Sequence, residues 1–356
     1  MSRIAAVATA LPEHVSTQAE ITELLAPMIT SDPVKQALLR RMHQSACVRT
    51  RHTVLPLESY RDVLAFGASN DLFVREATRL AARSLTGALG RAGIRADEID
   101  LIVFTSVTGM SAPSVDALLV AELGLRDDVR RLPLFGLGCV AGAAGISRVD
   151  DYLAGHPDHV AVLVAVELCS LTVQRDDDST DNLVASGLFG DGAAAVVMVG
   201  DGRAARAGTA GPAVVANRSR LYPGTQEVIG FRPSETGFQV ILTAGVTDTI
   251  DAHIPGDARA FLADHDLTVG DIAAWIAHPG GPKVLEAFER GLGLRDGPDG
   301  DLRRSWDSLA AVGNLSSASV LHVLAGELDA PHEPGDTGVL FALGPGVSAE
   351  FVLLRW

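Results

Sequence analysis

The order of features in the first half of the chain repeats in the second half. In the first half, an acidic turn at residues 97–100 leads into an apolar run, and Cys139 later opens a helical segment. In the second half, residues 270–272 lead into an apolar run, and Asn314 opens a helical segment. The number of residues from this turn to Asn314 is nearly the same as that from the first turn to Cys139. Self-similarity over so long a period usually reports a repeated architecture. The sequence therefore predicts two copies of one structural pattern.

Apolar runs typical of buried strands alternate with segments of helical periodicity. The expected strands are Leu101–Thr105, Val160–Val166, Ala193–Val199, Ala273–Ala277, Gly338–Leu343 and Glu350–Leu354, and the expected helices include Phe73–Ala92 and Ala141–Leu153. Such alternation is characteristic of α/β layer structures. We therefore expect an internally duplicated α/β sandwich with halves at residues 1–210 and 211–356. Cys139, His278 and Asn314 should converge where the halves meet.

Composition narrows the classes of partner. The formal net charge is −15, which disfavours nucleic acid and anionic membranes as general partners. A local basic cluster of Arg40, Arg41, Arg49 and Arg51 could still hold an anionic ligand. Apolar residues make up 47% of the chain, yet none of their runs is long enough to insert into a bilayer. The N-terminal segment lacks the pattern of a signal peptide, so we expect a cytoplasmic protein.

Three cysteines are too few to form a disulfide framework, and none has the spacing of a metal site. Small residues surround Cys139, and a helix is predicted to start just after it. The positive end of a helix dipole lowers the pKa of a nearby thiol, so Cys139 is a candidate nucleophile. The alternative is a buried structural cysteine. Cys47 and Cys169 lack the glycine-rich surroundings and are not expected to be nucleophiles.

His278 follows an expected strand and is followed by Pro-Gly-Gly-Pro, which ends the strand sharply. An imidazole beside Cys139 would stabilise the thiolate as an ion pair. The alternative is a structural histidine in a turn. His322, by contrast, falls inside an expected helix and should serve packing.

Asn314 stands in Gly-Asn-Leu-Ser-Ser, a pattern that also favours a simple helix N-cap. In the functional alternative, its side-chain amide donates to an oxyanion that develops beside His278. The repeat places Asn314 opposite Cys139, which favours the functional alternative.

Five segments together resemble the chalcone and stilbene synthase family, the type III polyketide synthases. They are Gly138-Cys139-Val140-Ala141-Gly142, Gly187-Leu188-Phe189-Gly190-Asp191-Gly192-Ala193, His278-Pro279-Gly280-Gly281-Pro282-Lys283, Gly313-Asn314-Leu315-Ser316-Ser317-Ala318-Ser319 and Gly344-Pro345-Gly346. The resemblance runs nearly end to end and follows the order of the family. Ketoacyl synthase III enzymes share the Cys-His-Asn set, but their histidine motif reads His-Gln-Ala-Asn. Bacterial long-chain alkylpyrone and alkylresorcinol synthases look most similar.

This resemblance implies a thiolase-like fold with α-β-α-β-α layers, an obligate homodimer, and no metal or redox cofactor. Cys139 would accept an acyl group from a starter CoA thioester. Malonyl-CoA, or methylmalonyl-CoA, would lose CO₂ while His278 and Asn314 stabilise the enolate, which then attacks the acyl-Cys139 thioester. Repeated extension and cyclisation would give an alkylpyrone or alkylresorcinol.

Further roles are carried over from the resemblance. Phe189 matches a gatekeeper phenylalanine, and Val240 stands near the place of a second one, which is a departure from the family. Thr172 and Ser316 match positions that line the cavity. Arg41 matches a basic contact to CoA, where a guanidinium would bind phosphate. Lys283 is expected on a helix surface.

Small side chains at three further positions suggest a channel for a long alkyl starter. Ala112 stands where plant chalcone synthases have a methionine, and Thr108 and Cys169 are also small. Neighbouring side chains could instead fill the space, because protein interiors are close-packed.

Two alternative functions stay open at this stage. One is a ketoacyl synthase III-like enzyme that makes a single condensation onto a carrier protein. The other, of a different class, is a non-catalytic acyl-CoA-binding relative that has kept the fold.

Overall fold

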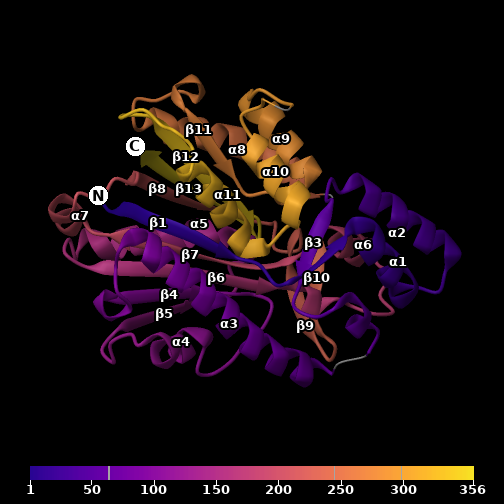
Figure 1. Ribbon diagram of the computed structural model, residues 1–356. Coiled ribbons are helices and arrows are strands. Elements are labelled where there is room, and N and C mark those ends of the chain that lie inside the picture. The colour runs from indigo at the N-terminus through magenta and orange to yellow at the C-terminus, as the bar shows by residue number, and fades with distance from the viewer. Residues whose placement is uncertain (63–64, 244, 298) are drawn as a thin grey trace.

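A computed structural model describes residues 1–62, 65–243, 245–297 and 299–356 (Figure 1). The strands are β1 Arg3–Ala10, β2 His14–Thr17, β3 Thr50–Thr53, β4 Leu101–Thr105, β5 Arg130–Leu134, β6 Val160–Leu168, β7 Asp191–Val199, β8 Ala213–Leu221, β9 Ile229–Ser234, β10 Gly237–Leu242, β11 Ala274–Ala277, β12 Thr337–Gly344 and β13 Ser348–Arg355. The α-helices are α1 Gln18–Ile29, α2 Pro33–Ser45, α3 Phe66–Ala92, α4 Val115–Leu123, α5 Ala141–Ala154, α6 Thr180–Leu188, α7 Asp201–Ala207, α8 Gly245–Ala263, α9 Pro282–Leu292, α10 Arg303–Val312 and α11 Ser319–Leu328. Short 3₁₀ turns include η3 Gly138–Val140 and η6 Ser316–Ala318.

The two halves of the main sheet have the same topology. Within the described residues, nine strands follow the order β11-β12-β13-β8-β1-β7-β6-β4-β5. In the first half β4 is parallel to β6, β6 antiparallel to β7, and β7 antiparallel to β1. In the second half β11, β12, β13 and β8 repeat this series of directions. The halves join at β1 and β8, where Arg3 pairs with Ala213. The predicted duplication is confirmed.

The helices complete a stack of layers, which Figure 1 shows with α5 and α11 between the two halves of the sheet. These two helices and the inner faces of both sets of strands share one buried apolar core. Helices α3 and α4 cover the outer face of the first half, around a second core. Helices α8, α9 and α10 cover the second half, around a third core. The order is therefore α-β-α-β-α, as expected for a thiolase-like fold.

The central strands form because their residues are apolar on both faces. Every residue of β6 and β7 is buried, as continuous Val/Ala/Leu runs predict for strands covered by helices on both sides. All six expected strands are present, and both expected helices match α3 and α5. The apolar pattern did not indicate β5, an edge strand with mostly exposed residues, or the hairpin formed by β9 and β10.

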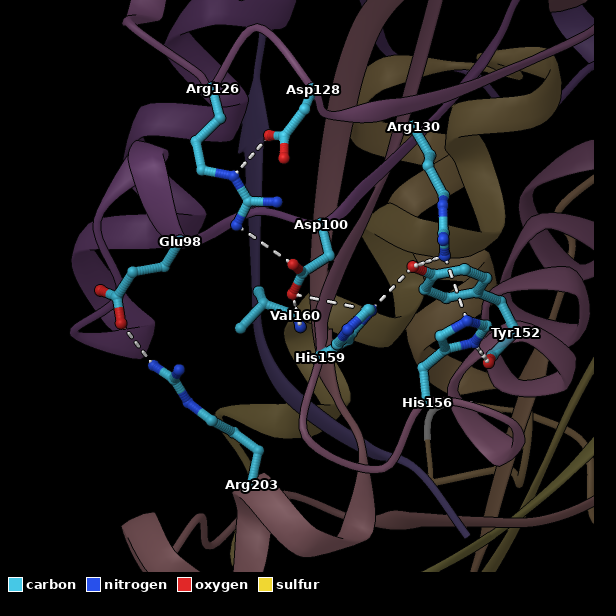
Figure 2. Close-up of polar contacts among 10 residues, drawn as sticks. All are labelled: Glu98, Asp100, Arg126, Asp128, Arg130, Tyr152, His156, His159, Val160 and Arg203. Atoms are coloured by element: carbon cyan, nitrogen blue, oxygen red, sulfur yellow. Dashed lines mark hydrogen bonds and ion pairs between the residues drawn. The ribbon is translucent and has the colours of Figure 1, made fainter.

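A polar cluster connects the N-terminal ends of β4, β5 and β6 by hydrogen bonds (Figure 2). The Asp100 carboxylate accepts hydrogen bonds from the Val160 N–H at 2.8 Å and from Arg126 Nη1 at 3.2 Å. The Asp100 carbonyl accepts from the Arg130 N–H at 3.0 Å, and Arg130 also donates to the Tyr152 hydroxyl at 2.9 Å. Tyr152 lies near the C-terminal end of α5, whereas Cys139 precedes the N-terminal end of the same helix. The cluster therefore stabilises the sheet at the end opposite Cys139.

Candidate active site

Cys139, His278 and Asn314 line one cavity of about 180 Å³. Cys139 lies in the turn η3 before α5, and His278 follows the end of β11. Asn314 lies between α10 and η6. One residue comes from the first half of the chain and two from the second. The convergence expected from the repeat is therefore present in the structure.

Gly142 allows the two halves to approach each other beside Cys139. A Cβ atom at this position would lie 2.3 Å from the Ser317 carbonyl oxygen and 2.8 Å from a Val320 methyl carbon. Any larger residue would push α5 away from η6 and α11. The small residues after Cys139 are thus required by close packing at the site.

The Cys139 thiol is held as a neutral group. Its Sγ lies 3.5 Å from the Ser316 hydroxyl oxygen. Burial raises the pKa of the thiol to about 11, and the Ser316 and Asn314 contacts lower it only in part. Burial is the largest cause of this shift, and its direction is opposite to the lowering expected from the helix start.

His278 is neutral for the same reason. It is 3% exposed, and burial lowers the pKa of its imidazole to about 3. Its backbone N–H donates to the Phe341 carbonyl at 2.9 Å, which fixes the residue at the end of the sheet. Among the described residues, no group pairs with Nδ1. In both residues burial favours the neutral form, so these shifts oppose the expected ion pair.

Asn314 is fixed by hydrogen bonds on both sides of its amide. Its Oδ1 accepts from the Ser316 N–H at 2.7 Å and from the Ser319 hydroxyl at 3.3 Å. Its Nδ2 donates one hydrogen to the Gly280 carbonyl at 3.1 Å. Because Oδ1 has the acceptor role, the orientation of the amide is defined. An NH₂ group carries two hydrogens, so the second is available to a ligand in the cavity.

A buried carboxylate that the sequence did not single out lies beside Cys139. Glu167 ends the apolar run of β6 and is fully buried. Its oxygens accept from the Ser317 hydroxyl, the Thr108 hydroxyl at 2.9 Å and the Val107 N–H at 3.1 Å. Burial raises the pKa of Glu167 despite these donors. A charged residue at the end of an otherwise apolar strand was the available signal.

Most of the expected substrate-contacting residues line the same cavity. These residues are Phe189, Thr172, Ser316, Thr108, Cys169 and Val240. Val240 lies on β10 directly opposite Phe231 of β9. Phe231 and Phe238 also line the cavity, and their rings meet edge to face at 5.2 Å. These two aromatic residues were not predicted from the sequence, although both lie within ten residues of Val240.

Ala112 and Arg41 lie apart from the cavity within the single chain. Ala112 is exposed and is not among the lining residues. Arg41 is exposed on α2, and Lys283 is exposed on α9, as expected for a helix surface. The apolar wall of the cavity is instead formed in part by Ile21, Leu24 and Leu25 of α1.

The described part of the chain holds no group of three or more His, Cys, Asp or Glu side chains that could bind a metal ion. Across the same residues, every helix is too short or too polar to cross a bilayer.

Comparison with known proteins agrees with this architecture. Residues 1–202 match the N-terminal domain of chalcone and stilbene synthases, and residues 213–356 match the C-terminal domain. A 1,3,6,8-tetrahydroxynaphthalene synthase from Streptomyces peucetius subsp. caesius is 54% identical, over 99% of this chain and 93% of the relative. An α-pyrone synthesis polyketide synthase-like protein of Mycobacterium tuberculosis is 32% identical, over 98% of this chain and 90% of the relative. The crystal structure of the tetrahydroxynaphthalene synthase of Streptomyces coelicolor A3(2), a bacterial type III polyketide synthase, superposes with a TM-score of 0.92 at 33% identity and 99% coverage of both chains.

A duplicated α/β fold with a thiol, an imidazole and an amide at the junction defines a condensing enzyme of the thiolase-like class. The chain belongs to the chalcone and stilbene synthase family. It is a type III polyketide synthase, an acyltransferase that forms carbon–carbon bonds. Enzymes of this family use CoA thioesters as substrates and need no further cofactor.

Proposed function

We propose that Cys139, His278 and Asn314 carry out iterative decarboxylative condensation with malonyl-CoA. The observation that carries the proposal is their convergence in one buried cavity. In the loading step, Cys139 Sγ attacks the carbonyl carbon of an acyl-CoA, and the neutral His278 imidazole takes the thiol proton. The C–S bond to CoA breaks, and the proton leaves with the CoA thiol. A neutral imidazole is the form that can accept this proton.

In the extension step, malonyl-CoA loses CO₂ and leaves an enolate of acetyl-CoA. Asn314 Nδ2 and an imidazole N–H of His278 donate to the thioester oxygen on which the negative charge develops. The enolate carbon then attacks the acyl-Cys139 carbonyl, and the Cys139 thiolate leaves. The product is a CoA thioester that is longer by two carbons. Burial of both donors strengthens their hydrogen bonds to the charge.

For the product, we propose 1,3,6,8-tetrahydroxynaphthalene built from malonyl units alone. The proposal is supported by the relative that is named for synthesis of this compound, because it is 54% identical over nearly the whole chain. The ten ring carbons of the product divide into five two-carbon units, so a single thioester could serve as starter and extender.

A long-chain starter, extended to an alkylpyrone or alkylresorcinol, is the second candidate. The apolar wall formed by Ile21, Leu24 and Leu25 favours it, because an alkyl chain gains free energy by burial against such side chains. The 32% identity to the α-pyrone synthesis protein gives further support.

Mass spectrometry of products separates these candidates. Purified protein is given malonyl-CoA alone, and then malonyl-CoA with a ladder of acyl-CoA starters, with methylmalonyl-CoA in place of malonyl-CoA as a further arm. Tetrahydroxynaphthalene from malonyl-CoA alone supports the first candidate. Pyrones or resorcinols that peak with long starters support the second. A single β-ketoacyl product that appears only with a carrier protein would contradict both and indicate a ketoacyl synthase.

We also propose that the enzyme is a homodimer that pairs along β5. This edge strand carries the exposed Leu132, and the exposed Phe135 follows it. Exposed apolar side chains on an unpaired edge favour association. Light scattering should give twice the chain mass, and Leu132→Lys with Phe135→Lys should give monomers. The cytoplasmic location and the CoA contact of Arg41 stay predictions.

A further inference from the structure

Arg51 is a buried arginine in the wall of the catalytic cavity. It lies on β3, is 4% exposed and lines the cavity, whereas Arg41 and Arg49 of the same basic cluster are exposed. Burial lowers the pKa of its guanidinium to about 10, which still leaves it a cation at neutral pH. A buried cation is costly unless its surroundings compensate it. Its contacts indicate what the protein gains from it.

The guanidinium of Arg51 forms hydrogen bonds with the backbone at the C-terminal end of α6. Its Nη1 donates to the Ser186 carbonyl and to the Phe189 carbonyl, both at 2.8 Å. Among the described residues, no group accepts from Nε or Nη2. The two carbonyl groups are therefore the hydrogen-bond acceptors that the protein supplies to this side chain, and both belong to the segment around the expected gatekeeper Phe189.

The aliphatic stem of Arg51 packs against the backbone that carries Asn314. A Cβ atom at Gly313 would lie 3.2 Å from Arg51 Cγ and 3.3 Å from Cδ. Gly313 also has φ +75°, a left-handed conformation that favours glycine. The stem thus fills the space left by a residue without a side chain, immediately before Asn314.

The two segments that Arg51 contacts are also joined to each other. The Asn314 N–H donates to the Leu188 carbonyl at 2.8 Å, and the Gly190 N–H donates to the Asn314 carbonyl at 3.0 Å. Arg51 lies across this junction, with its guanidinium on one segment and its stem on the other. Movement of the guanidinium would therefore shift the backbone of Asn314 and the direction of its amide.

We infer that Arg51 is a positioning residue that sets the Asn314 amide for malonyl decarboxylation. The inference rests on the proposed role of Asn314. Decarboxylation depends on a donor placed at the developing enolate oxygen, whereas acyl transfer to Cys139 depends on the thiol and the imidazole. Loss of Arg51 should therefore slow malonyl decarboxylation much more than acyl transfer to Cys139.

The test compares two reactions of the full-length protein. Conversion of malonyl-CoA to acetyl-CoA reports decarboxylation, and the intact mass of the protein reports acyl transfer to Cys139. Arg51→Met keeps the length of the stem but removes the donors, and it should lower kcat for decarboxylation about 10- to 100-fold while KM and acyl transfer change less than about threefold. Arg51→Lys, whose ammonium can still donate to both carbonyls, should stay within about fivefold of the wild type.

Arg3→Met is the matched control. Arg3 also donates to a backbone carbonyl at 2.8 Å, that of Gly211, but it lies outside the lining of the cavity. This variant should leave both reactions unchanged. Thermal unfolding of each variant shows whether it is folded at the assay temperature.

A double-mutant cycle with Asn314→Ala decides whether Arg51 acts through Asn314. In that background, the effect of Arg51→Met on decarboxylation should nearly vanish. Additive losses in the cycle would overturn the inference and show that the charge of Arg51 acts directly on the substrate. Equal losses of decarboxylation and acyl transfer in Arg51→Met would also overturn it. If Arg51→Met does not fold, the same cycle is run with Arg51→Lys, whose small loss should also vanish. If Asn314→Ala alone leaves decarboxylation intact, the proposed function of Asn314 has failed instead.

Discussion

The backbones of Phe189 and Asn314 pair as a parallel β-bridge. Phe189 belongs to the first half of the chain and Asn314 to the second, so the bridge crosses the junction of the duplicated fold. A residue of the cavity wall and a candidate oxyanion donor therefore have fixed relative positions. The hydrogen bonds on both sides of the Asn314 amide add to this rigidity. Preorganised donors of this kind stabilise developing charge without reorganisation.

The thiol of Cys139 should react slowly with alkylating agents at neutral pH. Its pKa is raised to about 11 by burial, and the thiolate is the reactive form. In a Cys47→Ser background, the rate of iodoacetamide modification of Cys139, followed by peptide mass spectrometry, should rise steadily up to pH 10. Ser316→Ala removes a contact that lowers this pKa, so it should reduce the rate about three- to tenfold at each pH. A plateau near pH 7 would show that the pKa of Cys139 is not raised.

The neutral state of His278 should make the protein less stable in acid. Its pKa is about 3 when folded, against 6.5 ordinarily, so below pH 6.5 the unfolded chain takes up a proton that the folded protein does not. Stability is therefore lost as the pH falls from 6.5 towards 3. By this linkage the contribution of His278 should fall by about 2 kcal/mol between pH 8 and pH 5. The difference in urea unfolding between wild type and His278→Asn measures it, and a difference that does not change with pH would show that the pKa of His278 is the same in the folded and unfolded protein.

A larger side chain at Val240 should shorten the products. Val240 faces Phe231 across the hairpin and lines the cavity, so Val240→Phe reduces the space for a growing chain. Product analysis should show fewer extensions from the same starter. Val15→Phe, on a strand position that is 55% exposed, is the matched control and should not change the products. Unchanged chain lengths for Val240→Phe would place the growing chain elsewhere.

Loss of the Asp100 carboxylate should destabilise the sheet without affecting catalysis. Asp100 accepts from Val160 and Arg126 at the end of the strands away from Cys139 (Figure 2). Asp100→Ala should lower the free energy of unfolding by about 2 kcal/mol, because charge-assisted hydrogen bonds are lost. Asp128→Ala, at a position that is 72% exposed, should cost less than about 0.5 kcal/mol. A fall in kcat for Asp100→Ala would show coupling along α5.

The sequence predicted the buried strands, the duplication and the three residues at the junction. These features depend on periodicity and order, which the chain displays directly, as the long buried Val/Ala runs of β6 and β7 illustrate. The pKa values of Cys139 and His278 depend on burial in three dimensions, which the sequence pattern does not display. The place of Ala112 outside the cavity was also not visible in the pattern.

The environment of Arg51 could not be predicted for a related reason. In the sequence it stands among other arginines and indicates an exposed basic surface. Only the fold shows that β3 carries it between Phe189 and Gly313, which are distant in the chain.

Intact-protein mass spectrometry after brief exposure to malonyl-CoA shows whether the growing chain is carried on Cys139. We expect covalent adducts that map to Cys139, with masses that correspond to growing polyketide chains, and no adducts in Cys139→Ala. In Asn314→Ala, we expect loaded acyl groups with little or no extension, and in His278→Asn we expect both loading and extension to be slow. Extended chains attached to another residue, or extension that persists without Cys139, would contradict this role of Cys139.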